Sequence, residues 1–204
     1  MSIAEYLAIY RKEDLYIMIG YALTGSFCTV GRSLEVLGEL VGQYDVLPII
    51  SESVRTTDTR FGKAADTMKR LEELCGRPPI TSIKEAEPLG PKIKLDALII
   101  APCTGNTLAK MANGITDTAV TMAAKAHRRN GRPLIVALAT NDGLSQNLCN
   151  ISTVMNRKNV YFVPFGQDDP EGKPNSLVAD LSLTAETLRL ALEGKQLQPI
   201  INAK

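Results

Sequence analysis

Short apolar runs alternate with helix-like segments along most of this chain, and this alternation constrains the fold more than any other feature. The runs are mostly rich in Ile, Val or Leu and cover residues 15–20, 45–51, 96–102, 132–140 and 160–166. Strands that are apolar on both sides are typical of a parallel sheet covered by helices on both faces. The pattern therefore predicts an α/β fold, a Rossmann-like open parallel sheet in a three-layer sandwich.

Helical periodicity fills the intervals between these runs. After the first run, apolar residues recur at steps of three and four, at Phe27, Val30, Leu34, Leu37 and Val41. Further helices are expected at 62–75, 104–113, 116–129, 145–157 and 176–193, whereas the Pro- and Gly-rich segment 164–176 predicts a long loop. A length of 204 residues without a linker predicts a single domain over 1–204.

Charge and composition argue against several classes of function. A net charge of +1, 5% aromatic residues and no Trp give no field or stacking platform for nucleic acid. No apolar run reaches the roughly 18–20 residues that span a membrane. The first 20 residues lack the basic and long apolar regions of a signal peptide, so a cytoplasmic protein is expected.

The cysteines and the single histidine give no metal-binding pattern. No C-x-x-C pair occurs, so we predict no metal site, and the thiols are expected to be reduced. Buried packing is the favoured interpretation for Cys28, Cys75, Cys103 and Cys149, with a redox role left open. His127 lies in a basic run, 125–132, which is expected to compensate a helix carboxyl terminus.

The segment "TGSFC" follows the first predicted strand. In open α/β sheets, ligands bind beside the carboxyl ends of the strands. Gly25 permits close approach of a ligand to the backbone, and Ser26 stands where a helix begins, so an anion is favoured here. A P-loop lysine is missing, which argues against nucleotide hydrolysis. A tight turn with an ordinary helix cap is the alternative.

Later strand ends also deliver hydroxyl, amide and guanidinium groups. Residues 51–60 bring two serines and two arginines, which suit phosphate or carboxylate, although a solvated loop is the alternative. The segment 101–125 brings further polar groups, with Pro102 expected to end the strand and Asp117 to begin the next helix, and Asn141 follows the fourth strand. This set resembles a binding cradle more than a hydrolytic site.

The same residues carry a family resemblance. The string P-x-[ST]-x-N-T-x-x-K-x-A-x-G-x-x-D is filled by Pro102, Thr104, Asn106, Thr107, Lys110, Ala112, Gly114 and Asp117. With "TGS" and "RPLIVALATN", it resembles the flavoprotein family of homo-oligomeric flavin-containing cysteine decarboxylases. This resemblance implies a flavin mononucleotide (FMN) cradle and a homo-oligomer.

The resemblance also implies roles for individual residues. Gly25 and Ser26 would hold the flavin phosphate, with Ser51 and Ser53 nearby. Residues after the third and fourth strands would line the flavin, namely Pro102, Thr104, Asn106, Thr107 and Asn141. Arg55 and Arg60 are weaker candidates for binding a carboxylate substrate.

A closer resemblance covers nearly the whole chain. The stretches "TTDTRFG", "AEPLGPK", "AKAHRRNGRP", "ATNDGL", "FVPFGQDDPEGKPNS" and "LQPI" resemble one subgroup, the B subunits of a two-subunit oxidoreductase of sporulation. This implies a partner, the A subunit, which is a dehydrogenase-like chain that binds NAD(P). Together the two chains would oxidise a dihydrodipicolinate-type precursor to dipicolinate in the mother-cell cytoplasm.

One departure from the wider family affects the expected chemistry. Its decarboxylases carry a histidine shortly before the third strand, where this chain has Lys92. Decarboxylation is therefore disfavoured, and the catalytic residues stay unassigned, with Arg60, Lys92, Lys110 and Asp117 as candidates only. Two alternatives remain open, a non-catalytic scaffold for the dehydrogenase chain and an independent FMN-binding flavoprotein.

Overall fold

A seven-stranded sheet forms the centre of the computed structural model, which describes residues 17–202. The strands lie in the order β2-β1-β3-β4-β7-β6, and β5 also pairs with β4. Their bounds are β1 Met18–Leu23, β2 Asp45–Ile50, β3 Ala97–Thr104, β4 Leu134–Thr140, β5 Val160–Phe162, β6 Phe165–Gly166 and β7 Leu177–Ala179. The first expected strand, 15–20, begins before the described residues. The signal-peptide argument used residues 1–20, and most of these also lie outside the described residues.

The sheet is mixed and not wholly parallel, which corrects one part of the prediction. Strands β1 to β5 pair in parallel, but β7 is antiparallel to both β4 and β6. The two neighbours share one edge of β4: β5 pairs at Leu134 and β7 pairs at Ala139. The chain between β6 and β7 reverses direction through the loop 167–176, and this reversal makes the last pairings antiparallel.

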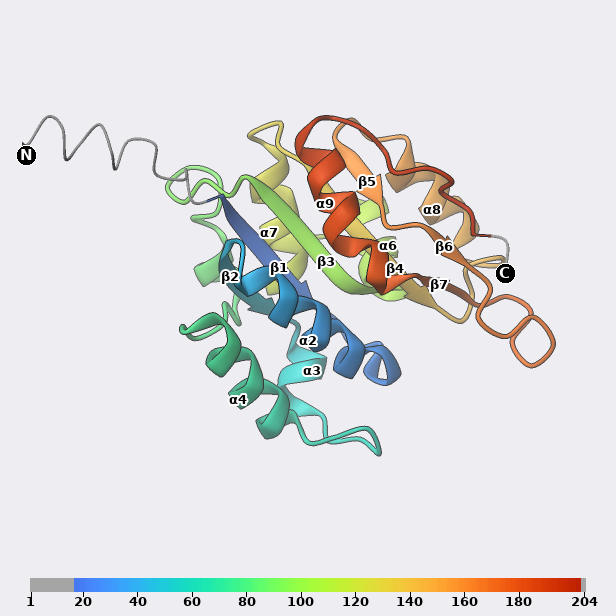
Figure 1. The fold of residues 1–204 in the computed structure, drawn as a ribbon, viewed down its shortest axis with the longest axis horizontal. Helices are drawn as coiled ribbons and strands as arrows, with labels where there is room; N and C mark the ends of the chain where they lie inside the picture. Colours follow the sequence, from blue (N-terminus) through green and yellow to red (C-terminus); the bar gives the residue numbers. More distant parts are fainter. Residues whose placement is uncertain (1–16, 203–204) are drawn as a thin grey trace, which may run out of the picture.

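Helices cover both faces of the sheet, as the alternation predicts. Figure 1 shows α2 and α9 in front of the sheet, with α6, α7 and α8 behind it. The helices are α2 Phe27–Val41, α3 Glu52–Thr56, α4 Ala64–Cys75, α5 Ile83–Ala86, α6 Gly105–Ala112, α7 Ala119–Arg128, α8 Leu148–Met155 and α9 Thr184–Leu192, with the 3-10 turn η1 Leu181–Leu183 before α9.

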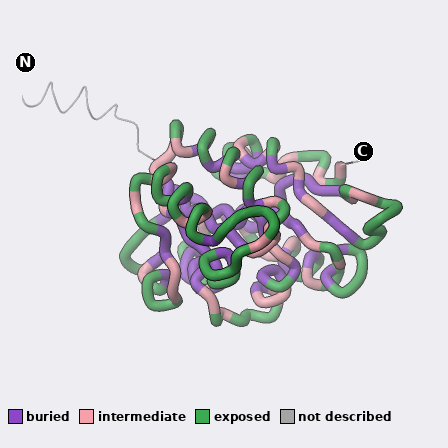
Figure 2. The backbone as a smooth tube through the Cα atoms, turned by 90° about the horizontal axis from the view of Figure 1, so that it is seen from below, coloured by how far each residue is buried: buried purple, intermediate pink, exposed green. Residues whose placement is uncertain are grey.

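The core lies between the sheet and these helices (Figure 2). All residues of β3 are buried except Thr104, and all residues of β4 are buried except Thr140. Both exceptions are at carboxyl ends, so the apolar strands release polar side chains at one edge of the sheet. This edge carries the candidate site.

Several expected boundaries were wrong. The first strand, expected at 15–20, extends to Leu23, and the expected run 160–166 is divided into β5 and β6. Pro102 does not end its strand, because β3 continues to Thr104 through a register shift against β4. The expected helix 176–193 begins with β7, since its first residues pair with β4 and β6. The cap of α7 is Thr118, whose hydroxyl accepts the N–H of Thr121, and not Asp117, which pairs with Lys110.

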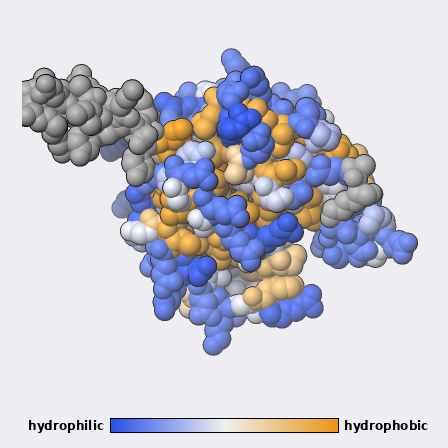
Figure 3. All heavy atoms as spheres, viewed as in Figure 1, coloured by the Kyte–Doolittle hydropathy of each residue, from blue (hydrophilic) through white to orange (hydrophobic). Residues whose placement is uncertain are grey.

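Charged and polar side chains are spread over the face drawn in Figure 3, with apolar residues visible between them. Among the described residues, no helix is long and apolar enough to cross a membrane.

Candidate functional site

An open cleft of about 640 Å³ lies at the carboxyl ends of β1, β3 and β4. Its walls come from the start of α2, the ends of β3 and β4, and the segment from 168 to 181. Four residues expected at the site line it together, Gly25, Ser26, Thr104 and Asn141. The ends of the first, third and fourth expected strands therefore form one cleft, whereas the segment after the second strand contributes only Phe61 to the lining.

The amino terminus of α2 opens into this cleft. Ser26 occupies the cap position, but its side chain makes no capping hydrogen bond, and its hydroxyl instead lies 3.0 Å from the Thr29 hydroxyl. The first backbone N–H groups of a helix have no partner within the helix, and the helix dipole makes this end positive. The start of α2 is therefore suited to an anion such as a phosphate.

Gly25 gives this helix end its close backbone surface. A Cβ at position 25 would lie 2.8 Å from the Ser53 hydroxyl oxygen, which is too close. Ser53 is linked in turn to Ser51, with 3.1 Å between their hydroxyl oxygens. Neither serine lines the main cleft, but the contact with Gly25 brings both close to it, as expected.

The end of β3 is held to β1 by a buried threonine. The Thr24 hydroxyl donates to the Pro102 carbonyl at 2.7 Å and accepts the Thr104 N–H at 3.0 Å. The Thr104 hydroxyl caps α6 by accepting the Thr107 N–H at 3.2 Å. Pro102 and Thr107 are thus buried supports of the cleft wall, whereas Asn106 is exposed on α6.

A polar network behind β4 positions the start of α6. The Asp142 carboxylate accepts hydrogen bonds from Thr140 and, at 2.8 Å, from the Asn147 side-chain amide. The bond from Thr140, followed by that from Asn147, lowers the pKa of Asp142 against the opposing effect of burial. Any side chain on Gly105 would overlap Thr140 and Asn147, so only glycine fits where α6 begins.

The cleft also contains residues that the sequence did not single out. Arg32 projects from α2 and lies 3.9 Å from Asp180, and Lys173 lies 3.3 Å from Asp168. Phe61 adds an exposed aromatic ring to the wall. The only signal in the sequence was the expected loop 164–176. In the structure, residues 167–176 connect β6 to β7 and carry Asp168 and Lys173, which line the cleft.

The two arginines expected near a substrate lie outside the cleft lining. Arg55 is paired with Glu52, with a closest N–O distance of 2.7 Å, and Arg60 lies over the Phe61 ring at 4.8 Å from its centroid. The candidates for proton transfer are also elsewhere. Lys110, in the last turn of α6, forms an ion pair with Asp117 at 2.9 Å, and Lys92 is exposed before the amino end of β3.

The four cysteines divide into two exposed and two covered thiols. Cys28 lies in the cleft and is exposed, as is Cys149 on α8. Burial raises the pKa of Cys75 to about 11 and also raises that of Cys103 strongly. The prediction of buried packing is therefore confirmed for Cys103, whereas it was wrong for Cys28, which lines the cleft, and for Cys149.

Comparison with known proteins gives a consistent result. Residues 7–182 match the model of the family described as Flavoprotein. The B subunit of dipicolinate synthase from Bacillus subtilis (strain 168) is 48% identical over 184 residues, which are 90% of this chain and 92% of that protein. This finding confirms the closer resemblance noted in the sequence.

Solved structures agree with the sequence comparison. The crystal structure of the dipicolinate synthase B subunit from Bacillus halodurans has a TM-score of 0.84 and 45% identity, covering 92% of this chain and 96% of that chain. The FMN-dependent cysteine decarboxylase SpaF has a TM-score of 0.62 and 21% identity, covering 87% and 97%, a likeness of fold alone. From the family match and these relatives, the chain belongs to the flavoprotein family.

Proposed function

We propose that this chain binds FMN in the cleft and acts as the B subunit of a dipicolinate synthase. The observation that carries the proposal is the 48% identity to the Bacillus subtilis protein of that name over 90% of this chain. Its setting is the cytoplasm of the mother cell of a sporulating bacterium. Like the dodecameric relative among the solved structures, it forms a homo-oligomer.

The cleft has the features that an FMN site needs. Gly25 and Ser26 expose the uncapped amino end of α2, which suits the phosphate, with Ser51 and Ser53 beside them. Thr104 and Asn141 line the space where the flavin ring would lie, while Pro102, Asn106 and Thr107 belong to the same wall. A volume of about 640 Å³ falls in the usual range for ligand sites, roughly 300–1,000 Å³.

The reaction proposed is the removal of two hydrogens from a dihydrodipicolinate-type ring to give the aromatic dicarboxylate. Two electrons and two protons leave the ring as one hydride and one proton. Oxidised NAD(P)+ held by the dehydrogenase-like partner, the A subunit, would supply the hydride acceptor, and the proton would go to solvent. FMN, when bound, supplies reversible two-electron chemistry. This chain's own residues bind the cofactor and shape the site. Arg55 and Arg60, which lie outside the cleft lining, would bind substrate carboxylates where the partner places the substrate beside them.

One observation favours the scaffold alternative, in which this chain stabilises its dehydrogenase-like partner without catalysis. Each charged residue that lines the cleft is in an ion pair. Lys173 pairs with Asp168, which is also in the lining, and Arg32 pairs with Asp180, which is not. Such pairing leaves no charged side chain of the described cleft lining dedicated to moving a proton. The independent flavoprotein alternative predicts turnover without the partner.

Two measurements test the proposal and separate these alternatives. FMN is titrated into the purified chain and into Gly25→Val, with Gly31→Ala in α2 as the control, since a Cβ at Gly31 meets nothing within 4 Å. Binding by the wild type and the control, with at least roughly tenfold weaker binding by Gly25→Val, is the expected result. Absence of FMN binding by the wild type would overturn the cofactor part.

Dipicolinate is then assayed with the dehydrogenase-like partner alone, with this chain alone and with both together. The proposal requires activity that depends on both chains. Full activity from the partner alone would reject a catalytic role for this chain, and activity that needs this chain but no FMN would favour the scaffold. Activity from this chain alone would favour the independent flavoprotein.

A further inference from the structure

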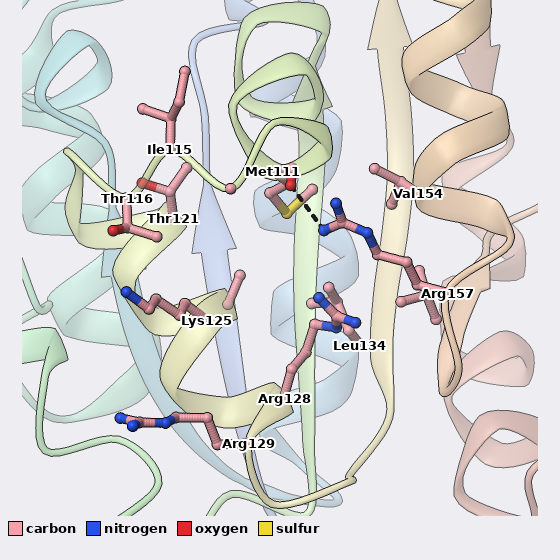
Figure 4. Close-up of a pocket in the computed structure, with 13 residues that line it drawn as sticks. Met111, Ile115, Thr116, Thr121, Lys125, Arg128, Arg129, Leu134, Val154 and Arg157 are labelled. Atoms are coloured by element: carbon pink, nitrogen blue, oxygen red, sulfur yellow. Dashed lines mark hydrogen bonds between the residues drawn. The ribbon is translucent and has the colours of Figure 1, made fainter.

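A second cavity lies at the opposite edge of the sheet from the cleft, among α6, α7 and α8 (Figure 4). Its volume is about 320 Å³, and it lies beside the amino ends of β4 and β5, where Leu134 and Val160 begin their strands. The flavin cleft is formed at the carboxyl ends of the strands, so the two sites share no lining residue in the described part of the chain.

The walls of this cavity combine an apolar floor with a cationic rim. Met111, Leu134 and Val154 supply apolar surface, and Ala124 adds to it from α7. The same space is lined by four cations, Lys125, Arg128, Arg129 and Arg157, and by no carboxylate of the described residues. Within residues 17–202 none of the four takes part in an ion pair.

Two of these guanidinium groups converge inside the cavity. Figure 4 shows the Arg128 side chain entering from α7 and the Arg157 side chain from the segment after α8. Arg157 is held by the last carbonyls of α6, donating to Met111 at 2.8 Å and to Ala112 at 2.6 Å. Arg128 Nε is buried and has no hydrogen-bond partner among the described residues.

The positive charges that line this cavity have no anionic partner among the described residues. Burial, and then the charge of Arg157, lower the pKa of Arg128, which reflects a cation that is partly desolvated beside another cation. A buried donor without a partner is costly, and two like charges at close range repel. As expected, the basic run 125–132 places Lys125, His127 and Arg128 in the last turn of α7. The last carbonyls of α6 are capped separately, by Arg157.

We propose that this cavity is a binding site for a small carboxylate with an apolar body, such as a ring carboxylate, in which the anion meets Arg128 and the body lies on Met111, Leu134 and Val154. A carboxylate matches the fork of the Arg128 guanidinium and brings a negative charge to a cavity that is lined by four cations and by no carboxylate of the described residues. The cavity volume is at the lower end of the usual range for ligand sites, roughly 300–1,000 Å³, which suits a ligand of this size. The proposal does not depend on the function proposed for the cleft.

The test uses the full chain in its native assembly and three probes, benzoate, the neutral benzamide and inorganic phosphate, measured by calorimetric titration. Benzoate is expected to bind at least roughly tenfold more tightly than either of the others, because it alone offers both charge and an apolar ring. Equal binding of benzamide would overturn the role of the arginines, and equal binding of phosphate would overturn the role of the apolar floor.

Matched variants locate the site. Arg128→Met removes the guanidinium but keeps an unbranched, apolar side chain, and it is expected to weaken benzoate binding roughly tenfold or more, whereas Arg128→Lys causes a smaller loss. Lys158→Met removes an exposed cation outside the lining and is the control, with affinity within twofold of wild type. Unchanged thermal midpoints confirm that the variants fold. No benzoate binding to the wild type, or full binding by Arg128→Met, would overturn the proposal.

Discussion

Thr24 is hydrogen bonded to Thr104 across the carboxyl ends of β1 and β3, the Thr24 hydroxyl accepting the Thr104 N–H at 3.0 Å while it donates to Pro102 at 2.7 Å. The Thr24 side chain is almost fully buried, at 1% exposure. This single hydroxyl therefore satisfies two backbone groups at the point where β3 loses its register with β4. The Thr24 hydroxyl thus connects the end of β1, which leads to α2, with the end of β3, which forms part of the cleft wall.

Thr24→Val is expected to destabilise the protein by about 1–3 kcal/mol, because it leaves two buried backbone groups without a partner. The measurement is the free energy of unfolding in urea. Thr67→Val on the exposed face of α4 is the control and should change stability by less than about 0.5 kcal/mol. Equal effects of the two substitutions would contradict the role assigned to Thr24.

Two glycine substitutions should act in opposite directions. Gly105→Ala forces a methyl group into Thr140 and Asn147 and should cost about 1–3 kcal/mol. Gly31→Ala lies in the exposed middle of α2, where an added Cβ meets nothing within 4 Å, and should stabilise by about 0.5–1 kcal/mol. Thermal unfolding of both variants checks the prediction, which fails if Gly105→Ala is neutral.

His127 should titrate below the ordinary histidine range. Its Nε2 donates to the Pro133 carbonyl at 2.9 Å, so Nδ1 is the unprotonated nitrogen, and Nδ1 is buried without a partner in the described residues. Burial lowers the pKa of His127 below 6.5. As His127 is the only histidine in the chain, proton NMR reads its pKa directly.

The consequence for stability follows from the direction of this shift. Below about pH 6.5 the unfolded chain binds a proton at His127 that the folded chain resists, so this contribution to stability is present above that pH and is lost as the pH falls. Unfolding in urea at pH 7.5, 6.5 and 5.5 should show the loss, and His127→Gln should reduce the slope. A native pKa at or above 6.5 would contradict this assignment.

Alkylation of the thiols reports on the cleft. In the native protein at pH 8, iodoacetamide should modify Cys28 and Cys149 quickly, while burial protects Cys103 until the chain unfolds. The half-buried Cys75 should react slowly, because its pKa is raised to about 11. FMN at saturating concentration should slow the reaction at Cys28, which lines the cleft, and leave Cys149 unchanged as the internal control. Mass spectrometry of the peptides measures each site, and equal protection of both thiols would argue against FMN in this cleft.

Much of the architecture follows from local sequence patterns. The apolar runs locate β2, β3 and β4 to within about two residues, and the amphipathic stripe locates α2, because burial on two faces or on one face leaves a direct mark on composition. The meeting of Gly25, Ser26, Thr104 and Asn141 follows from the rule that parallel strands end at the same edge.

Other features depend on contacts between distant parts of the chain. Pro102 has no N–H for the β ladder and is tolerated inside β3 because the register with β4 shifts between Ile100 and Cys103. The Thr24 hydroxyl satisfies the Pro102 carbonyl, and no pattern around residue 102 encodes either feature. Likewise, β7 is only three residues long and gains its pairing from β4 and β6, so its sequence alone resembles the start of α9. The charges that Arg32 and Lys173 bring to the cleft are placed by tertiary folding.

The division of β4 between two neighbours has a further consequence. The amino half of β4 belongs to the parallel sheet through β5, while its carboxyl half is covered by a short antiparallel strand at the end of the loop 167–176. Changes of length or sequence in that loop reshape the wall that carries Asp168 and Lys173 without altering any parallel pairing. The parallel strands β1 to β5 therefore form a framework that does not depend on the loop 167–176. A change in this loop can alter which ligand the cleft accepts and leave that framework intact.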